Sequence, residues 1–155
     1  MSAGISGLAS VSLSDTGQFV AAGSTLTMDA VKHAGKTILL DTAAGSVVTL
    51  PASTGAKLVY RFMVSVLATS NSHKIQVANS SDILAGTVLT AGDGPSAHAW
   101  VTASDSDTIT LNRTTTGSVV RGEWFEIVDI AANVFLVRGV TAATGTEATP
   151  FSAAV

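Results

Sequence analysis

The chain has 155 residues, which is enough for one domain with a substantial core and too few for two domains of ordinary size. It contains no cysteine, which excludes disulfides, thiol catalysis and zinc–thiolate sites. The formal net charge is -3 and the 8 Lys and Arg residues are scattered along the chain. Because nucleic-acid binding needs a clustered basic surface, this charge pattern argues against it.

The composition indicates a protein that works within an assembly. Hydrophobic residues make up 46% of the chain and aromatic residues only 5%, so the apolar content is largely Ala and Val. Ser and Thr together supply about a quarter of the residues, well above ordinary globular usage. Charged residues contribute 12%, about half the usual share. A surface so poor in charge is either covered by small side chains or buried against other subunits, and we favour the second interpretation.

The N-terminal residues 1–25 are rich in Ser, Gly and Ala, with Leu13, Phe19 and Val20 as the few large side chains. This composition predicts an extended arm that is either mobile or ordered only on binding, followed by a single β-sandwich or barrel domain over residues 26–155. The segment lacks the positive flank and apolar run of a signal peptide. No run of about 18 apolar residues occurs, so no membrane span is expected.

Alternation of apolar and polar residues then predicts a series of short strands. Residues 36–41 and 46–50 form the first two, with a turn at Gly45 between them. The longest, residues 58–67, places Tyr60, Phe62 and Val64 on one face. Further strands are predicted at 74–78, 97–102, 108–113, 123–130 and 134–138, with an ambiguous stretch at 82–90, a turn at 92–95 and a tight connection at Asn133.

Helix is disfavoured throughout, since Thr, Val, Ser and Gly dominate and no sustained helical spacing occurs. Short strands separated by turn signals predict an all-β fold, a single-domain antiparallel β-sandwich or barrel of jelly-roll or tulip-like form with few or no helices. A β-helix or an intertwined trimer is the alternative, although no repeat recurs. The large side chains are predicted to be structural anchors of the core or of an interface, with a sugar-stacking platform as the alternative for the two tryptophans. These anchors are Tyr60, Phe62, Trp100, Trp124, Phe125 and Phe135.

The residues offer little for catalysis. The only possible histidine bases are His33, His73 and His98, and no Gly-x-Ser-x-Gly nucleophile motif accompanies them. His73 follows Ser70-Asn-Ser72, so we expect a solvated loop residue. His98 alternates with Trp100 on one strand, which indicates a packed or interface histidine. We therefore expect no enzymatic activity.

The acidic residues point to no cofactor site. Asp105 and Asp107 lie two apart in a loop, where carboxylates can bind calcium. They lack the Gly and the later Glu of an EF-hand loop, so calcium is the lesser alternative to a simple turn. Glu123 and Glu126 are three apart on one strand and are expected on opposite faces, not as a carboxylate pair. We predict neither a metal nor a cofactor.

Two segments carry a resemblance to a known family. The first is Asp41-Thr-Ala-Ala-Gly-Ser-Val-Val-Thr-Leu-Pro-Ala-Ser-Thr-Gly55, followed by Val59-Tyr-Arg-Phe62. The second is Gly122-Glu-Trp-Phe-Glu-Ile-Val-Asp-Ile130, followed by Val134-Phe-Leu-Val137 and Thr149-Pro-Phe-Ser152. Both resemble segments of the capsid decoration proteins, also called head auxiliary or cement proteins, of tailed bacteriophages, and related strings occur in head-fibre and tail-fibre proteins. Phe135 stands where the family more often has a second Trp, and Lys57 interrupts its small-residue loop.

The resemblance implies a structural virion protein that binds the outer capsid surface as a homotrimer at three-fold or quasi-three-fold positions. Its partners would be the major capsid protein and itself, with neither nucleic acid nor membrane involved. It would stabilise the expanded shell by bridging major capsid subunits, after synthesis in the host cytoplasm. The alternative is a head-fibre or tail-fibre domain that binds a host receptor or glycan.

Overall fold

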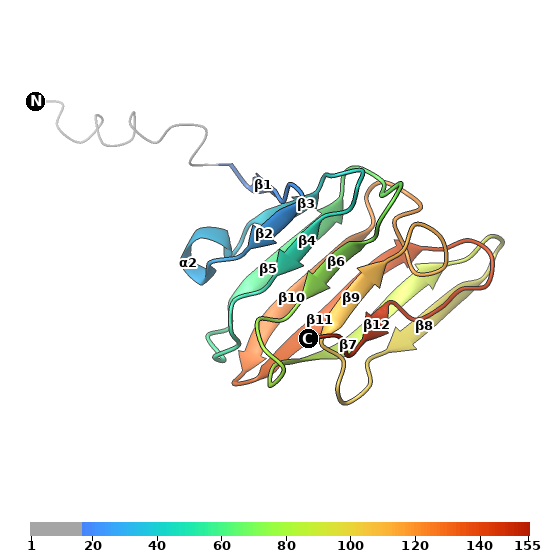
Figure 1. Ribbon diagram of the computed structural model, residues 1–155. Coiled ribbons are helices and arrows are strands. Elements are labelled where there is room, and N and C mark those ends of the chain that lie inside the picture. The colour runs from blue at the N-terminus through green and yellow to red at the C-terminus, as the bar shows by residue number, and fades with distance from the viewer. Residues whose placement is uncertain (1–16) are drawn as a thin grey trace, which may run out of the picture.

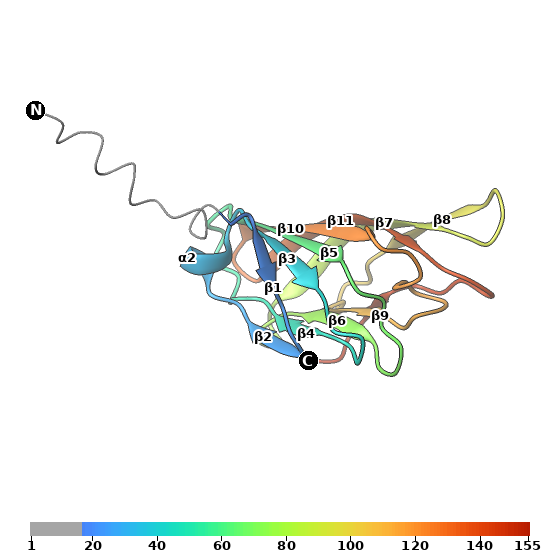
Figure 2. The same cartoon turned by 90° about the horizontal axis from the view of Figure 1, so that it is seen from above.

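The computed structural model describes residues 17–155, and these residues form two β-sheets packed face to face (Figures 1 and 2). Sheet A has seven strands in the order β1-β3-β5-β10-β11-β7-β8, and sheet B has five in the order β12-β9-β6-β4-β2. The prediction of an all-β sandwich is confirmed. Of the segment predicted as an arm, residues 1–16 lie outside the described part, whereas residues 19–21 already belong to sheet A.

The strands of sheet A are β1 (Phe19–Ala21), β3 (Thr37–Leu40), β5 (Val59–Val64), β7 (Ile83–Ala91), β8 (Ala97–Val101), β10 (Trp124–Ala131) and β11 (Val134–Ala142). Those of sheet B are β2 (Thr25–Thr27), β4 (Val47–Thr49), β6 (His73–Gln76), β9 (Thr108–Leu111) and β12 (Phe151–Ser152). One helical turn, α2 (Ala30–His33), links β2 to β3, and the Asp29 carboxylate caps it by accepting from the N–H groups of Val31 and Lys32. No helix within residues 17–155 is long and apolar enough to cross a membrane.

The sheets are mixed, which corrects the expectation of a purely antiparallel sandwich. From β1 to β6 the chain alternates between the sheets, so that β1, β3 and β5 are parallel neighbours in sheet A and β2, β4 and β6 in sheet B. The turn at Gly45 therefore carries the chain from one sheet to the other and does not close a hairpin. From β1 to β6 the chain thus winds between two parallel-stranded sheets as in a β-helix, the alternative considered above, although the sequence contains no repeat.

The second half of the chain closes both sheets with antiparallel strands. The β10–β11 hairpin turns at Asn133, as predicted, with a positive φ of 62°. The ambiguous stretch at 82–90 becomes β7, which pairs in parallel with β11 and antiparallel with β8. Gly86 permits the first pairing, because a Cβ at this position would lie 1.9 Å from the backbone oxygen of Val137.

The core lies between the two sheets and consists of the side chains that point inward at every second position of the strands. Ile38, Phe62 and Phe125 are adjacent across β3, β5 and β10, and each is at most 1% exposed. Sheet B contributes Val48, Ile75 and Ile109, which are also in register. Burial of these side chains supplies the main driving force for joining the sheets.

Candidate interaction surface

The outer face of sheet A, turned away from sheet B, is the most distinctive surface of the molecule. In β10 the inward positions are Phe125, Ile127 and Asp129, so the outward positions are Trp124, Glu126, Val128 and Ile130. The strand register places outward side chains of neighbouring strands directly beside one another. The outer face can therefore be described as rows that run across the sheet.

Three such rows cover the middle of the face. The tryptophan row contains Ala21, Leu39, Met63, Trp124, Val140, Leu89 and Ala99, one residue from each strand of sheet A. The arginine row contains Phe19, Thr37, Arg61, Glu126, Arg138, Thr87 and Val101. The leucine row contains Val59, Val128, Leu136 and Ala85. Two apolar rows thus enclose one that is polar at its centre.

Glu126 is the electrostatic centre of the face. Its carboxylate accepts from Nε of Arg61 at 3.1 Å and from Nε and Nη2 of Arg138 at 3.0 and 2.5 Å. The hydrogen bond from Arg138, together with the charges of both arginines, outweighs burial and lowers the pKa of Glu126. Both arginine side chains remain largely exposed, at 49% and 65%, while that of Glu126 is 15% exposed. Within residues 17–155, the guanidinium groups therefore keep donors for a second acceptor.

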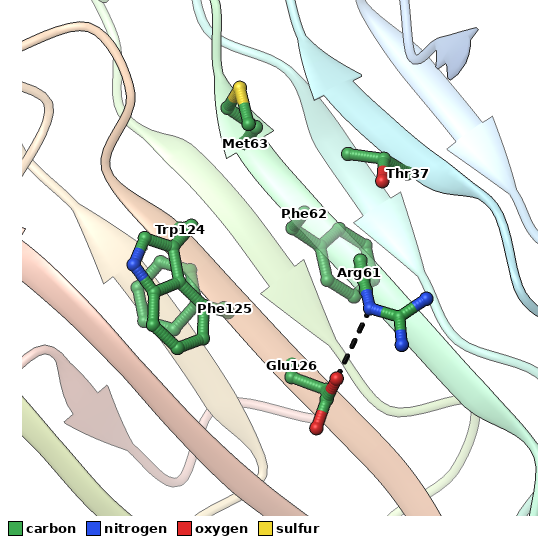
Figure 3. A pocket seen from close by; sticks show the side chains of 7 residues that line it. All are labelled: Thr37, Arg61, Phe62, Met63, Trp124, Phe125 and Glu126. Carbon is green, nitrogen blue, oxygen red and sulfur yellow. Dashed lines mark hydrogen bonds and ion pairs between the residues drawn. The ribbon is translucent and has the colours of Figure 1, made fainter. Parts of the chain in front are cut away.

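Trp124 lies between two hollows of this face. One, of about 270 Å³, is lined by Trp124, Met63, Arg61, Glu126 and Thr37 (Figure 3). The other lies on the side of Val140 and the loop 120–123. Figure 3 shows Trp124 and Glu126 on β10 and Arg61, which is paired with Glu126, on the neighbouring β5. The indole is 41% exposed and offers a large apolar surface with a polar N–H, the kind of side chain on which protein interfaces depend.

The outer face of sheet B differs in kind. Its rows consist mainly of hydroxyl and other polar side chains, namely Thr27, Thr49 and Gln76 in one and Thr25, Val47, Lys74 and Thr110 in the other. Thr108 continues the first row but is buried, and its hydroxyl donates to Asp107. Water can satisfy such a surface at no cost. Among the residues that the structure describes, only the outer face of sheet A combines large exposed apolar side chains with a charged centre.

The predicted structural anchors fall into three groups. Tyr60, Phe62, Phe125 and Phe135 are fully buried in the core. Trp100 is half-buried, packs against the core and stacks on His98 with ring centroids 5.7 Å apart. Trp124 is not a core residue and belongs to the outer face described above.

Asp129 is a key residue that the sequence analysis missed. Its buried carboxylate accepts from Oγ of Ser53 at 2.8 Å, from the N–H and hydroxyl of Thr54, and from the N–H groups of Gly55 and Ala56 at 2.6 and 3.1 Å. Burial alone would raise the pKa of Asp129, but these hydrogen bonds outweigh it and lower the pKa. The signal in the sequence was a carboxylate at an inward position, after Phe125 and Ile127.

This contact joins the two segments that carry the family resemblance. Ser53, Thr54 and Gly55 end the first segment, and Asp129 lies near the end of the hairpin segment. A bridge between Thr54 and Ala132 adds to the contact. The shared motifs therefore meet in one structural unit that fixes a loop against β10.

The histidines are not brought together. His73 is fully buried, contrary to the solvated loop position expected for it, because its ring bridges two loops: Nδ1 accepts from the N–H of Ser46 at 2.9 Å and Nε2 contacts the carbonyl of Val66 at 2.8 Å. Burial lowers its pKa. The His33 ring contacts the backbone of Asp29, and that of His98 lies 3.5 Å from Glu147.

The two aspartates considered for calcium occupy different environments. Asp105 is exposed, whereas Asp107 is buried and accepts from the Thr108 hydroxyl and from the N–H groups of Ala154 and Val155. Asp107 thus holds the last residues of the chain in place. Within residues 17–155, no three His, Asp or Glu side chains are grouped so that they could hold a metal ion.

Comparisons with models of protein families, with curated proteins and with solved structures found no match.

Proposed function

We propose that the chain is a structural virion protein that binds the outer capsid surface of a tailed phage and stabilises the expanded shell by bridging major capsid subunits. The observation that carries the proposal is the contact of the buried Asp129 carboxylate with Ser53 and Gly55, which joins the two segments that resemble decoration proteins. The outer face of sheet A, which residues 17–155 leave exposed and where two apolar rows enclose the Arg61–Glu126–Arg138 group, indicates a chain that works within an assembly. A soluble protein rarely leaves such a face to water, and a protein that works between subunits needs one.

Two further features support this role. The body is a two-sheet sandwich whose loop at residues 53–56 is held by the buried carboxylate of Asp129, which suits a protein that bears load. The segments that resemble decoration proteins are the ones that Asp129 joins, so the resemblance concerns a spatial unit and not only scattered residues. The trimeric state implied by that resemblance stays a prediction.

The mechanism is mechanical. Each bound copy contributes many modest contacts across a junction between capsid subunits, and binding to the assembled shell alone stabilises it by mass action. Such a role needs no reactive group, in keeping with the absence of enzymatic activity that the sequence predicts.

The test uses purified full-length chain and expanded, empty capsids built from the major capsid protein of the same phage. Co-sedimentation with the capsids and a higher temperature of capsid disruption, measured by light scattering, are expected. Unexpanded capsids serve as the control. If the chain neither sediments with expanded capsids nor changes their heat resistance, while it adsorbs to host cells or a glycan array, the fibre alternative replaces the proposal.

A further inference from the structure

The outer face of sheet A is large enough to form a specific protein interface. Six inter-strand spacings of about 4.8 Å give a width of about 29 Å, and about six residues along the strands give a length of about 20 Å. Covering this face on two molecules would bury about 1,200 Å², the lower bound of stable and specific interfaces. The side chains available include Leu89, Trp124, Leu136 and Val140, which are between 37% and 51% exposed.

We infer that this face packs against the same face of a second copy of the chain, related by a two-fold axis that runs along the strands between β10 and β11. Such an axis lies near the middle of sheet A, with four strands on one side and three on the other. It places β10 of each copy opposite β11 of the other, and β5 opposite β7. A self-complementary interface of this kind is the commonest arrangement of soluble homo-oligomers.

The register makes the face complementary to itself under this rotation. In each pair, the first residue of either copy faces the second residue of the other copy. The pairs are Trp124 with Val140, Val128 with Leu136, Met63 with Leu89, and Glu126 with Arg138. Apolar residues of the tryptophan and leucine rows therefore meet apolar residues of the same rows. Aligned sheet packing keeps strand directions within about 30° at a separation of about 10 Å, so the match holds best for the central strands.

The arginine row is matched in the same way. Within one copy Glu126 already accepts from Arg138 at 2.5 Å, yet the Arg138 side chain is 65% exposed. The second copy brings another Arg138 to Glu126 and another Glu126 to Arg138, so each carboxylate lies between guanidinium groups of both molecules. Arg61 faces Thr87 of the second copy, whose hydroxyl can accept a hydrogen bond. Charges buried with partners of opposite sign fix the register of an interface.

A second copy fits this face better than an unrelated partner does, because one operation satisfies the apolar rows and the charged row together. Pairing by a two-fold axis differs from the trimer implied by the family resemblance, so the subunit number in solution separates the two. If two copies pair through this face, capsid binding would use other surfaces of the dimer, so the inference does not depend on capsid binding. A dimeric chain that ignores capsids would contradict the proposed function alone, and a monomeric chain that binds capsids would contradict the inference alone.

The first test measures the mass of the full-length chain by sedimentation velocity over a range of concentrations. The expected mass is twice the chain mass of 15.6 kDa. Leu136→Lys places an unpaired charge against Val128 of the second copy, and should raise the dimer dissociation constant at least about tenfold. Gln76→Lys, on the outer face of sheet B, is the matched control and should leave the constant unchanged. Circular dichroism and urea unfolding confirm that both variants are folded.

The second test exploits the absence of cysteine from the chain. Val128→Cys lies beside the inferred axis, so a thiol cross-linker that spans about 10 Å should yield covalent dimers. Gln76→Cys, on the opposite face of the molecule, should yield none. A wild-type monomer or trimer, or equal cross-linking of the two variants, would overturn the inference.

Discussion

Replacing Asp129 with Asn tests whether the buried carboxylate holds the loop at residues 53–56 to β10. Five donors surround this carboxylate: the hydroxyls of Ser53 and Thr54 and the N–H groups of Thr54, Gly55 and Ala56. Asn retains one acceptor oxygen, and its amide NH₂ would point toward donors. At least two hydrogen bonds to a charged group would be lost, and N–H groups of this part-buried loop would lose their acceptor.

The expected loss of stability is large. Hydrogen bonds to charged groups contribute about 1.5–3 kcal/mol each, so Asp129→Asn should lower the free energy of unfolding by about 3–6 kcal/mol. For a domain of this size, 1 kcal/mol corresponds to about 2–4 °C. The midpoint of thermal unfolding should therefore fall by about 6–24 °C.

The assay is urea unfolding at pH 7 followed by tryptophan fluorescence, with Asp105→Asn as the control because that carboxyl is exposed. The control should change stability by less than about 0.5 kcal/mol. Since the pKa of Asp129 is lowered below 3.8 in the folded state, the unfolded chain takes up the proton first as the pH falls below that value. The advantage of wild type over Asp129→Asn should therefore be complete above pH 3.8 and shrink below it. A stability for Asp129→Asn within about 0.5 kcal/mol of wild type at pH 7 would refute the reasoning.

Three further outcomes follow from the structure. Because burial lowers the pKa of His73 below 6.5 in the folded state, the free energy of unfolding of the wild type should fall as the pH drops through 6.5. In His73→Gln this fall should be smaller, as shown by comparing urea midpoints at pH 8 and pH 5. Gly86→Ala places a Cβ on backbone at a positive φ and should destabilise the chain by about 3 kcal/mol or more in the same assay, whereas Gly94→Ala, with open space around it, should change little. Asp107→Asn should leave the fold intact but speed amide hydrogen exchange at Ala154, because the wild-type carboxylate accepts from this N–H at 2.7 Å. Unchanged exchange would contradict the role of Asp107 in holding the last residues in place.

The positions of most strands could be predicted from the sequence, but their partners could not. Alternation placed Tyr60, Phe62 and Val64 on one face, and all three are buried, because a period of two fixes the face of a strand whatever lies beside it. The turn at Gly45 was also foreseen. A turn does not state whether the next strand joins the same sheet or the opposite one, and here it crosses to the other sheet.

The candidate surface was predicted only in part. Trp124 and Phe125 were both expected to be anchors, yet adjacent residues of a strand point to opposite faces, so only one could enter the core. Phe125 is buried and Trp124 lies outside. The rows of the outer face depend on the register of strands that lie far apart in the chain, such as those of Arg61 and Glu126, which are 65 residues apart. No local pattern encodes this register.

The order of strands in sheet A has a consequence for biosynthesis. The two middle strands, β10 and β11, come from the last third of the chain, and they alone connect the parallel group β1-β3-β5 to β7 and β8. A nascent chain emerging from the ribosome therefore carries two unjoined halves of a sheet until residue 142 has been made. Such non-local pairing predicts folding in milliseconds to seconds rather than microseconds, begun only after translation is nearly complete.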